Sequence, residues 1–217
     1  MRACLRFAAD VSLGYLTAAL KDLGSGVKAS VLLHLPALSI TGSLNAILRD
    51  LLAHGFSVAG SYNFSGSNHS GYLFQISNSY AANGSEAEQI ERVIVAALRL
   101  ALLERRCVKE FAETKPTFMR DQIARSYAAA RTARFVSLRE SMDILARLRL
   151  GVNAGYIEGL DSRELAALLY KMKPEYVTRA RDYASRIESD VTSEETRSDR
   201  TRALILKFAL DKSVLLI

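Results

Sequence analysis

The periodicity of the apolar residues changes once along this chain, close to Ser85. Before that residue, short apolar and β-branched runs alternate with clusters of Gly, Ser and Asn, which is typical of strands joined by turns. After it, apolar residues recur at helical spacing behind capping residues. Strands followed by helices predict an α+β fold, in which an antiparallel or mixed sheet precedes a helical region. We expect the sheet-rich part to cover residues 1–84 and the helical part residues 85–217.

Three strands and one helix are predicted before Ser85. The helix has Leu and Ile at helical spacing over residues 44–52, and Gly55 is placed to end it. Pro36 is expected to stop the first strand, because proline cannot donate a hydrogen bond to a neighbouring strand. The predicted strands cover residues 27–35, 56–64 and 72–77.

Four helix starts are predicted from one recurring pattern. A Ser, Thr or Asp is followed three residues later by Glu, so that the two side chains can bond backbone N–H groups of the first turn. The pairs are Ser85 with Glu88, Ser137 with Glu140, Asp161 with Glu164, and Thr192 with Glu195. The helix after Ser85 is expected to run to about residue 112 and to bury one face, which consists of Ile90, Val93, Ile94, Ala97, Leu98 and Ala101.

Basic residues are concentrated in the second half of the chain. Residues 92–217 carry a net charge of +7, whereas residues 1–91 carry −1. The arginines lie among Glu and Asp at helical spacing, which indicates solvated helix faces more than a surface for nucleic acid. The longest apolar stretch, residues 93–103, contains Arg99 and is shorter than the roughly 18 residues that span a membrane. We therefore expect a cytoplasmic protein whose partners are neither nucleic acids nor membranes.

Side chains that commonly carry chemistry are few. The histidines His34, His54 and His69 have no second His or Cys at ligand spacing, so we predict no metal site. The two cysteines are too few for a disulfide framework. A loop of residues 24–26, Gly-Ser-Gly, precedes Lys28, and such a loop either cradles a phosphate or makes a tight connection between strands.

Several longer segments carry a resemblance to a known family. They are GYLTAALKDLGSGVKASVLLHLPAL at 14–38, GYLFQISNS at 71–79, DQIARSYAAARTAR at 121–134, LARLRLGVNAGYIEGLDSRELAALLY at 145–170 and SDRTRA at 198–203. With these segments the chain resembles the C-terminal catalytic domain of the ATP:guanido phosphotransferases, and most closely their bacterial protein-arginine kinases. The resemblance implies transfer of the γ-phosphoryl group of ATP, with Mg, to a guanidinium. Such transfer depends on positioning and on arginines that clamp the phosphates.

The resemblance also assigns two segments to the nucleotide. They are Lys28, Ala29, Ser30, Val31 and Leu32, and then Ala59, Gly60, Ser61, Tyr62, Asn63 and Phe64. Lys28 and Ala59 stand where the family has arginines, and residues 61–66 lack the family's Glu. The family's active-site Cys is also missing, since residues 19–22 read Ala-Leu-Lys-Asp. We therefore expect no catalytic residue, and weak or absent binding of ATP with Mg.

A second assignment from the resemblance is a site that reads phosphoarginine. The corresponding residues here are Ser198, Asp199, Arg202 and Ala203, with Ser198 in place of the family's first Arg. An arginine fork for the phosphoryl oxygens and a carboxylate for the guanidinium suit such a ligand. The competing interpretation is an ordinary Asp–Arg pair three residues apart on a solvated helix.

These observations lead to two functional hypotheses. The first is a truncated, catalytically impaired protein-arginine-kinase-like domain that acts as a regulatory or binding module in protein arginine phosphorylation and protein quality control. The alternative is the C-terminal half of a split kinase whose N-terminal half is a separate chain. Expected partners are a kinase activator, a full-length or N-terminal-half kinase, and clients that bear phosphoarginine.

An incomplete sheet has a further expected consequence. The resemblance implies that early strands of the catalytic domain are missing, which would leave a strand edge open. We therefore expect an oligomer or an obligate complex, with the apolar tail at residues 213–217 as one candidate cover for that edge.

Overall fold

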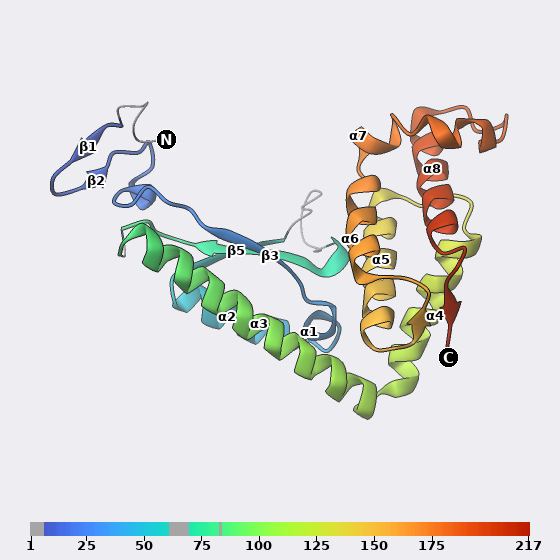
Figure 1. Ribbon diagram of the computed structural model, residues 1–217, viewed down its shortest axis with the longest axis horizontal. Coiled ribbons are helices and arrows are strands. Elements are labelled where there is room, and N and C mark those ends of the chain that lie inside the picture. The colour runs from blue at the N-terminus through green and yellow to red at the C-terminus, as the bar shows by residue number, and fades with distance from the viewer. Residues whose placement is uncertain (1–6, 61–69, 83) are drawn as a thin grey trace. The chain divides into compact units, whose positions relative to one another are not determined.

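The computed structural model describes residues 7–60, 70–82 and 84–217, and Figure 1 shows its elements. The chain forms two compact units, which are described separately below. The first contains described residues up to 60 together with residues 73–105, and the second contains residues 70–72 and 106–217. The predicted α+β fold, with antiparallel pairing and a helical C-terminal region, is confirmed. The predicted division between residues 84 and 85 stays a prediction.

A three-stranded antiparallel sheet is the centre of the first unit. Strand β5 (Leu73–Asn78) lies between β3 (Ser30–His34) and β4 (Phe56–Gly60). Figure 1 labels β5 and β3, which lie side by side. All three strands were expected from the sequence, and β3 ends before Pro36 as predicted. The continuation of β4 predicted for residues 61–64 lies outside the described residues. A short pair of strands, β1 (Ala9–Asp10) and β2 (Gly14–Tyr15), and a 3₁₀ turn, η1 (Leu20–Asp22), precede the sheet.

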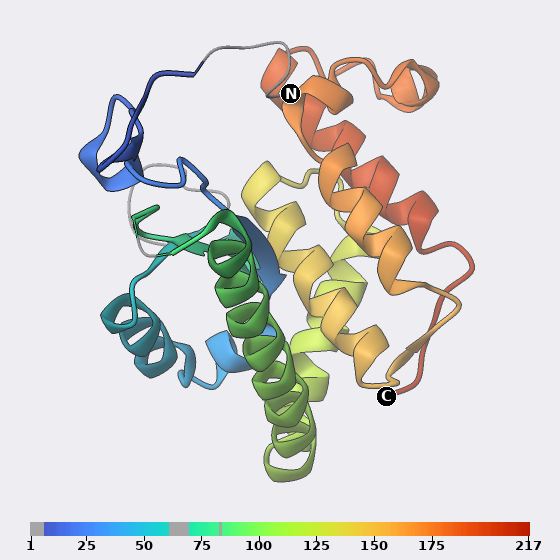
Figure 2. The same cartoon turned by 60° about the vertical axis from the view of Figure 1, so that its left-hand side comes forward.

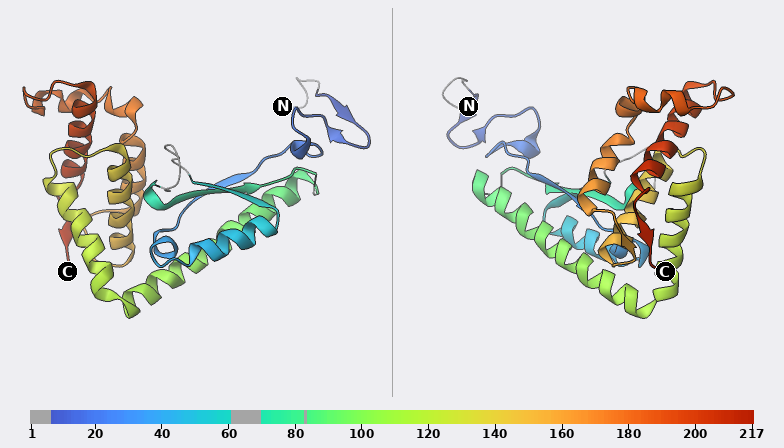
Figure 3. Two further views of the ribbon diagram at one scale, coloured as in Figure 1. Left: turned by 180° about the vertical axis from the view of Figure 1, so that it is seen from behind. Right: turned by 45° about the vertical axis from the view of Figure 1, so that its right-hand side comes forward.

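Two helices cover one face of this sheet. Helix α2 (Leu44–Ala53) and helix α3 (Glu86–Thr114) lie on the same side of the strands in Figure 3. Gly55 follows α2 with a φ of 80°, which confirms its predicted role in ending that helix. The buried core between the two helices and the sheet consists of Leu51, Ile76, Ala96 and Leu100, flanked by Leu33, Ile47, Leu48, Phe56 and Val58.

Helix α3 buries a different face from the predicted one. Val93 and Ala97 are buried as expected, but Ile90, Ile94 and Leu98 are exposed by 44%, 47% and 60%. The buried side includes Ala96 and Leu100 instead, which pack against Ile76 of the sheet. Since apolar residues surround more than half of α3, their periodicity alone does not say which side meets the core.

A buried carboxylate ties α3 to a short helix in the same unit. Glu104 accepts hydrogen bonds from the backbone N–H groups of Ala37 (2.8 Å) and Leu38 (3.0 Å) in helix α1 (Pro36–Ile40). Those groups belong to the first turn of α1, where N–H groups have no partner within the helix. Burial raises the pKa of the Glu104 carboxyl, although both hydrogen bonds act to lower it.

The second unit is built almost entirely of helices. Figure 2 shows α4, α5, α6 and α8 packed beside one another, with α5 between α4 and α6. The elements are α4 (Pro116–Thr132), α5 (Leu138–Asn153), α6 (Ser162–Lys171), α7 (Pro174–Val177), α8 (Glu194–Ala209) and the 3₁₀ turns η2 (Ser70–Tyr72) and η3 (Arg181–Arg186). None of the helices in the described ranges is long and apolar enough to cross a membrane.

Helix starts agree with three of the four predicted caps. Ser85 and Glu88 bond each other's backbone N–H groups, and Asp161 with Glu164 forms a second capping box. Ser137 caps α5 by accepting from the N–H of Glu140. The fourth prediction, Thr192, is wrong, because the neighbouring Ser193 caps α8 by accepting from the N–H of Thr196. Adjacent Thr and Ser residues are both good caps, so the pattern did not separate them.

The C-terminal tail forms a strand within the second unit. Strand β7 (Val214–Leu215) pairs antiparallel with β6 (Ile157–Glu158). The Tyr127 hydroxyl donates to the Ser213 carbonyl oxygen at 2.7 Å, which fixes the start of the tail against α4. The tail therefore pairs with β6 and is bonded to Tyr127. The sequence predicted neither contact, and suggested instead that the tail covers an open edge of the sheet.

The Glu104 contact yields a stability prediction. Replacing Glu104 with Ala leaves two buried N–H groups without acceptors, so the free energy of unfolding should fall by about 2–4 kcal/mol. Urea unfolding of the full chain measures this change. The control is Glu110→Ala, an exposed position on the same helix, which should change stability by less than about 0.5 kcal/mol. Equal losses in both variants would show that the two hydrogen bonds do not stabilise the fold.

Candidate functional site

The two predicted nucleotide segments meet on one sheet face. Leu32 of β3 and Ala59 of β4 both lie opposite Gln75 of the central strand, so the three side chains form one row. All three are exposed, and they lie on the face opposite the core that α2 and α3 cover. The register thus brings together residues that are far apart in the sequence.

Not every predicted nucleotide residue lies on that face. Val31 is paired with Ile76, whose side chain is in the core, so Val31 faces the helices. Ser30 is exposed on the same side as Leu32, and Gly60 ends β4 opposite Phe74. Four more of the predicted residues, Ser61, Tyr62, Asn63 and Phe64, lie outside the described residues.

A buried asparagine positions the chain around Lys28. Asn78 accepts from the N–H of Ala29 at 2.8 Å and donates to the Val27 carbonyl at 2.9 Å. These two bonds hold the backbone on both sides of Lys28, whose side chain is exposed. Among the described residues, Lys28 forms no ion pair with a carboxylate, so its charge is available to an anion.

The open sheet face is almost uncharged. Its described strand residues include His34 but no Asp, Glu, Lys or Arg. They are Ser30, Leu32, His34, Ser57, Ala59, Leu73, Gln75 and Ser77, of which Leu73 and Ser77, in the central strand, are buried. A triphosphate and its metal ion need several fixed cations and carboxylates. Of those groups, this part of the chain supplies only the neighbouring Lys28.

The glycine loop before Lys28 is committed to internal contacts. Ser25 donates from both its N–H (3.3 Å) and its hydroxyl (3.0 Å) to the Ala81 carbonyl, and the N–H of Val27 bonds the Ser25 hydroxyl. Gly24 and Gly26 have φ values of 102° and 65°, which suit a tight connection. The loop lines a cavity of about 300 Å³ that also includes Phe7, Tyr15 and Glu86. The N–H groups of Ser25 and of Val27, which follows the loop, are therefore unavailable to a phosphate.

The predicted phosphoarginine residues lie at the buried side of α8. Arg202 donates to Asp199 Oδ1 at 2.6 Å and to the Met172 carbonyl at 2.9 Å, and only 6% of its side chain is exposed. Burial lowers the pKa of Arg202 and raises that of Asp199, although their mutual attraction acts in the opposite direction. Ser198 is half-buried and Ala203 is buried. Two of the five N–H groups of the Arg202 guanidinium are thus used by acceptors within the protein.

A second arginine on α8 was not predicted as a site residue. Arg200 donates to both carboxylate oxygens of Glu188, at 2.6 and 2.7 Å, and Glu188 also pairs with Arg134. The Arg200 hydrogen bonds lower the pKa of the Glu188 carboxyl from its ordinary value near 4.5 to about 2. The bidentate geometry joins the segment before α8 to the helix itself.

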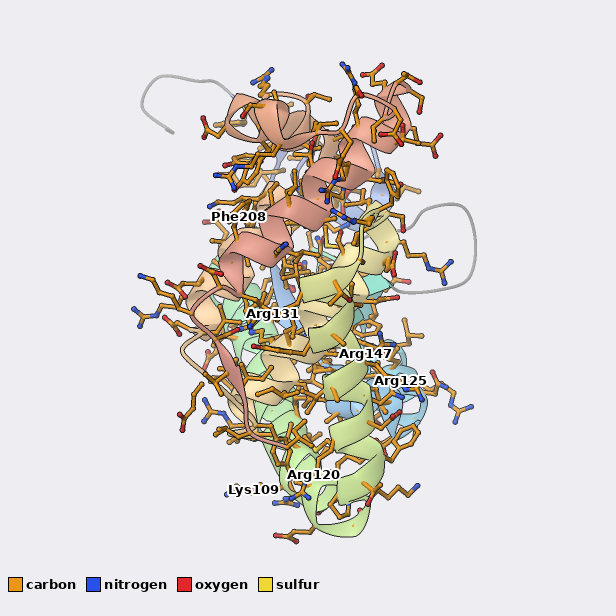
Figure 4. All side chains as sticks on the ribbon, turned by 90° about the vertical axis from the view of Figure 1, so that its right-hand side faces the viewer. Lys109, Arg120, Arg125, Arg131, Arg147 and Phe208 are labelled. Atoms are coloured by element: carbon orange, nitrogen blue, oxygen red, sulfur yellow. The ribbon has the colours of Figure 1, made fainter. Side chains whose placement is uncertain are left out.

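The structure also contains an arginine-lined cavity that sequence reasoning missed. It measures about 350 Å³ and lies between α4 and α5, where Figure 4 labels Arg125 and Arg147. Arg139 completes the set of basic side chains, and Asp143 and Glu140 also line the cavity. Arg125 pairs with Asp121, four residues earlier on α4, and Arg147 donates to the Tyr72 hydroxyl. The sequence does not indicate that these arginines line one cavity, because they come from two different helices, α4 and α5.

Comparisons with known proteins match both parts of the chain. Residues 1–107 match the family model for the ATP:guanido phosphotransferase C-terminal catalytic domain, and residues 116–213 match that for the protein-arginine kinase McsB C-terminal domain. A protein-arginine kinase of Desulforamulus reducens is 34% identical over 168 residues, which cover 77% of this chain and 47% of the relative.

Two further relatives are also protein-arginine kinases. The protein-arginine kinase of Moorella thermoacetica is 35% identical over 173 residues, covering 80% of this chain and 49% of the relative. That of a Geobacillus species is 32% identical over 201 residues, covering 93% of this chain and 53% of the relative. The chain therefore spans about half the length of the curated relatives it matches.

The Glu188 contact predicts a pH dependence. A carboxyl whose pKa is lowered in the folded state stabilises the fold above its unfolded pKa, and this contribution is lost as the pH falls from about 4.5 to about 2. The unfolding midpoint should therefore drop less over that range in Glu188→Gln than in the unaltered chain. Urea unfolding at several pH values tests this, with Glu175→Gln, an exposed position without a described ion pair, as control. Identical pH profiles for all three proteins would contradict the assignment.

Proposed function

Because the chain belongs to the ATP:guanido phosphotransferase family, we propose that it is a catalytically impaired protein-arginine-kinase domain with a binding or regulatory role in protein arginine phosphorylation. Phosphoryl transfer is accelerated by groups that position the reactants and stabilise charge in the transition state. The proposal therefore rests on how few such groups the candidate site contains.

The observation that carries the proposal is the row Leu32, Gln75 and Ala59 on the open sheet face. These side chains bear no charge, and no Asp, Glu, Lys or Arg accompanies them among the described strand residues of that face. Loss of one preorganised donor lowers a rate by roughly 10²–10³-fold, and such losses are not additive. Strand residues without fixed cations, as described for this face, should thus give little stabilisation to a migrating phosphoryl group.

The same residues do not fit a tightly bound ATP with Mg. Lys28 offers one point charge, without the fork with which an arginine holds two phosphate oxygens. Ser25 and Val27 direct their N–H groups to internal acceptors. Any nucleotide affinity left in the segments 28–32 and 59–64 is accordingly proposed to be weak, and no residue is proposed as catalytic.

A binding role is supported by the helical unit. It matches the C-terminal domain of protein-arginine kinases, and it contains both the Asp199–Arg202 pair and the cavity lined by Arg125, Arg139 and Arg147. Guanidinium groups are well suited to phosphoryl and carboxylate oxygens. We propose proteins as the partners: a kinase activator, a full-length kinase or phosphoarginine-bearing clients of protein quality control. We propose that the protein acts in the cytoplasm, where ATP is available for protein phosphorylation.

The alternative function is that of one half of a split protein-arginine kinase. One observation favours it, namely that the chain spans about half the length of its curated relatives. An N-terminal-half kinase supplied as a separate chain would then be the obligate partner. The uncharged sheet face predicts feeble activity even for that assembly.

A phosphotransfer assay tests the proposal. The purified full chain, given ATP, Mg and a protein substrate, should form no acid-labile phosphoarginine, because the described strand residues of the open sheet face supply none of the charges that the reaction requires. The matched positive control is the full-length protein-arginine kinase of the Geobacillus species under identical conditions. Turnover within about tenfold of that control would overturn the proposal. Activity that appears only after an N-terminal-half kinase is added would favour the split-kinase alternative.

A further inference from the structure

Three arginines from two helices line one cavity of the helical unit. Arg125 comes from α4, whereas Arg139 and Arg147 come from α5, and the cavity of about 350 Å³ is also lined by Glu140 and Asp143. With three arginines against two carboxylates, the formal charge of this lining is +1. None of the α8 residues predicted for phosphoarginine is among the described residues that line it. The cavity is therefore a separate, basic feature of this unit.

The guanidinium of Arg147 lacks an acceptor where it is buried. Its Nη2 donates to the Tyr72 hydroxyl at 3.2 Å, and its central carbon lies 5.8 Å from the centre of the Tyr72 ring. Its Nε is buried, and the described part of the chain supplies neither an acceptor for Nε nor a carboxylate that pairs with this guanidinium. Because a partly buried cation without a counter-ion is costly, the arrangement favours an anion from outside the chain.

Arg125 is fixed in place but keeps most of its donors. Its Nε donates to both carboxylate oxygens of Asp121, at 2.9 and 2.8 Å. Within the described ranges its two terminal nitrogens form no hydrogen bond, so one edge of the guanidinium can bind a second acceptor. Figure 4 labels Arg125 and Arg147 on the same side of the helical unit. Both arginines are thus positioned to donate to one ligand in the cavity.

The charges of the lining favour a carboxylate over a phosphoryl group. A carboxylate carries one negative charge, which balances the +1 of the lining, and its two oxygens accept parallel bonds from a guanidinium. A phosphate monoester carries about −1.5 to −2 and would also meet the carboxylates of Glu140 and Asp143. The start of α5, with Ser137 and Arg139, lines the same cavity, so the positive end of that helix adds to the attraction.

We propose that this cavity binds the carboxylate side chain of an Asp or Glu from an acidic segment of a protein partner. Arg125 and Arg147 are the principal donors, and the ligand supplies the acceptor that the buried Nε of Arg147 lacks. Glu140 and Asp143 disfavour ligands of higher negative charge. The inference specifies the chemistry of the binding role proposed above, and in that respect it rests on the proposed function.

Isothermal titration calorimetry of the full chain with an oligoglutamate peptide tests this binding at low ionic strength. We expect saturable binding of oligoglutamate and none of an oligoglutamine peptide of the same length, because the guanidinium groups require an ionised partner. The comparison of the two peptides separates recognition of a carboxylate from recognition of an extended backbone.

Two substitutions at Arg125 test the guanidinium geometry. Arg125→Gln and Arg125→Lys should each weaken oligoglutamate binding at least fivefold, because lysine keeps the charge but loses the fork. The control is Arg120→Gln, which changes an exposed arginine on the same helix that does not line the cavity. It should change the affinity less than twofold, although it lowers the net charge of the chain, +6, by the same amount as Arg125→Gln.

A substitution at Glu140 should have the opposite effect. Glu140→Gln removes a negative charge from the lining and leaves the arginines in place, so oligoglutamate should bind about threefold more tightly. Glu140 is exposed, and circular dichroism verifies that this variant and the Arg125 variants remain folded. A purely structural role of the cavity would not produce a gain in affinity.

Three results would overturn the inference. They are the absence of saturable oligoglutamate binding, equal affinities of Arg125→Gln and the unaltered chain, and displacement of the peptide by inorganic phosphate at an ionic strength at which sodium chloride does not displace it. The last result would assign the cavity to a tetrahedral oxyanion. Because the titration contains no nucleotide, its failure is distinct from a failure of the phosphotransfer prediction, which concerns the sheet face.

Discussion

The packing of α3 against the three-stranded sheet is the contact on which the first unit depends. Ala96 and Leu100 of the helix meet Ile76 of the central strand, and Glu104, one turn further on, holds the first turn of α1 through two backbone N–H groups. Because one sheet face packs against the helices, the row of Leu32, Gln75 and Ala59 lies exposed on the other face. The same packing leaves the far side of α3 exposed.

Much of the local structure was predictable, because it depends on neighbouring residues. The three strands, the end of α2 at Gly55 and the caps at Ser85, Ser137 and Asp161 follow from patterns a few residues long. The buried face of α3 and the pairing of β7 with β6 were not predictable in this way. Both depend on contacts between distant segments, which periodicity and composition do not specify. The capping pattern also did not predict that Ser193, rather than Thr192, caps α8.

The candidate site shows the same limit. The sequence indicated which segments belong to the nucleotide region, and the strand register explains how Leu32 and Ala59 come to flank Gln75. It did not indicate that Val31 would face the core. Nor did it show that Arg202 would already bond Asp199 and the Met172 carbonyl, or that arginines of α4 and α5 would share a cavity. Those facts depend on helix rotation and side-chain direction, which only packing decides.

The central claim is that too few fixed positive charges, and not a different fold, make the binding of ATP by this chain weak. Isothermal titration calorimetry with Mg-ATP tests this directly, on the unaltered chain and on the double variant Lys28→Arg, Ala59→Arg. The account predicts no saturable binding by the unaltered chain up to about 1 mM ATP, and at least tenfold tighter binding by the variant, because a hydrogen bond to a charged group contributes about 1.5–3 kcal/mol. Tight binding by the unaltered chain, with no gain in the variant, would contradict it.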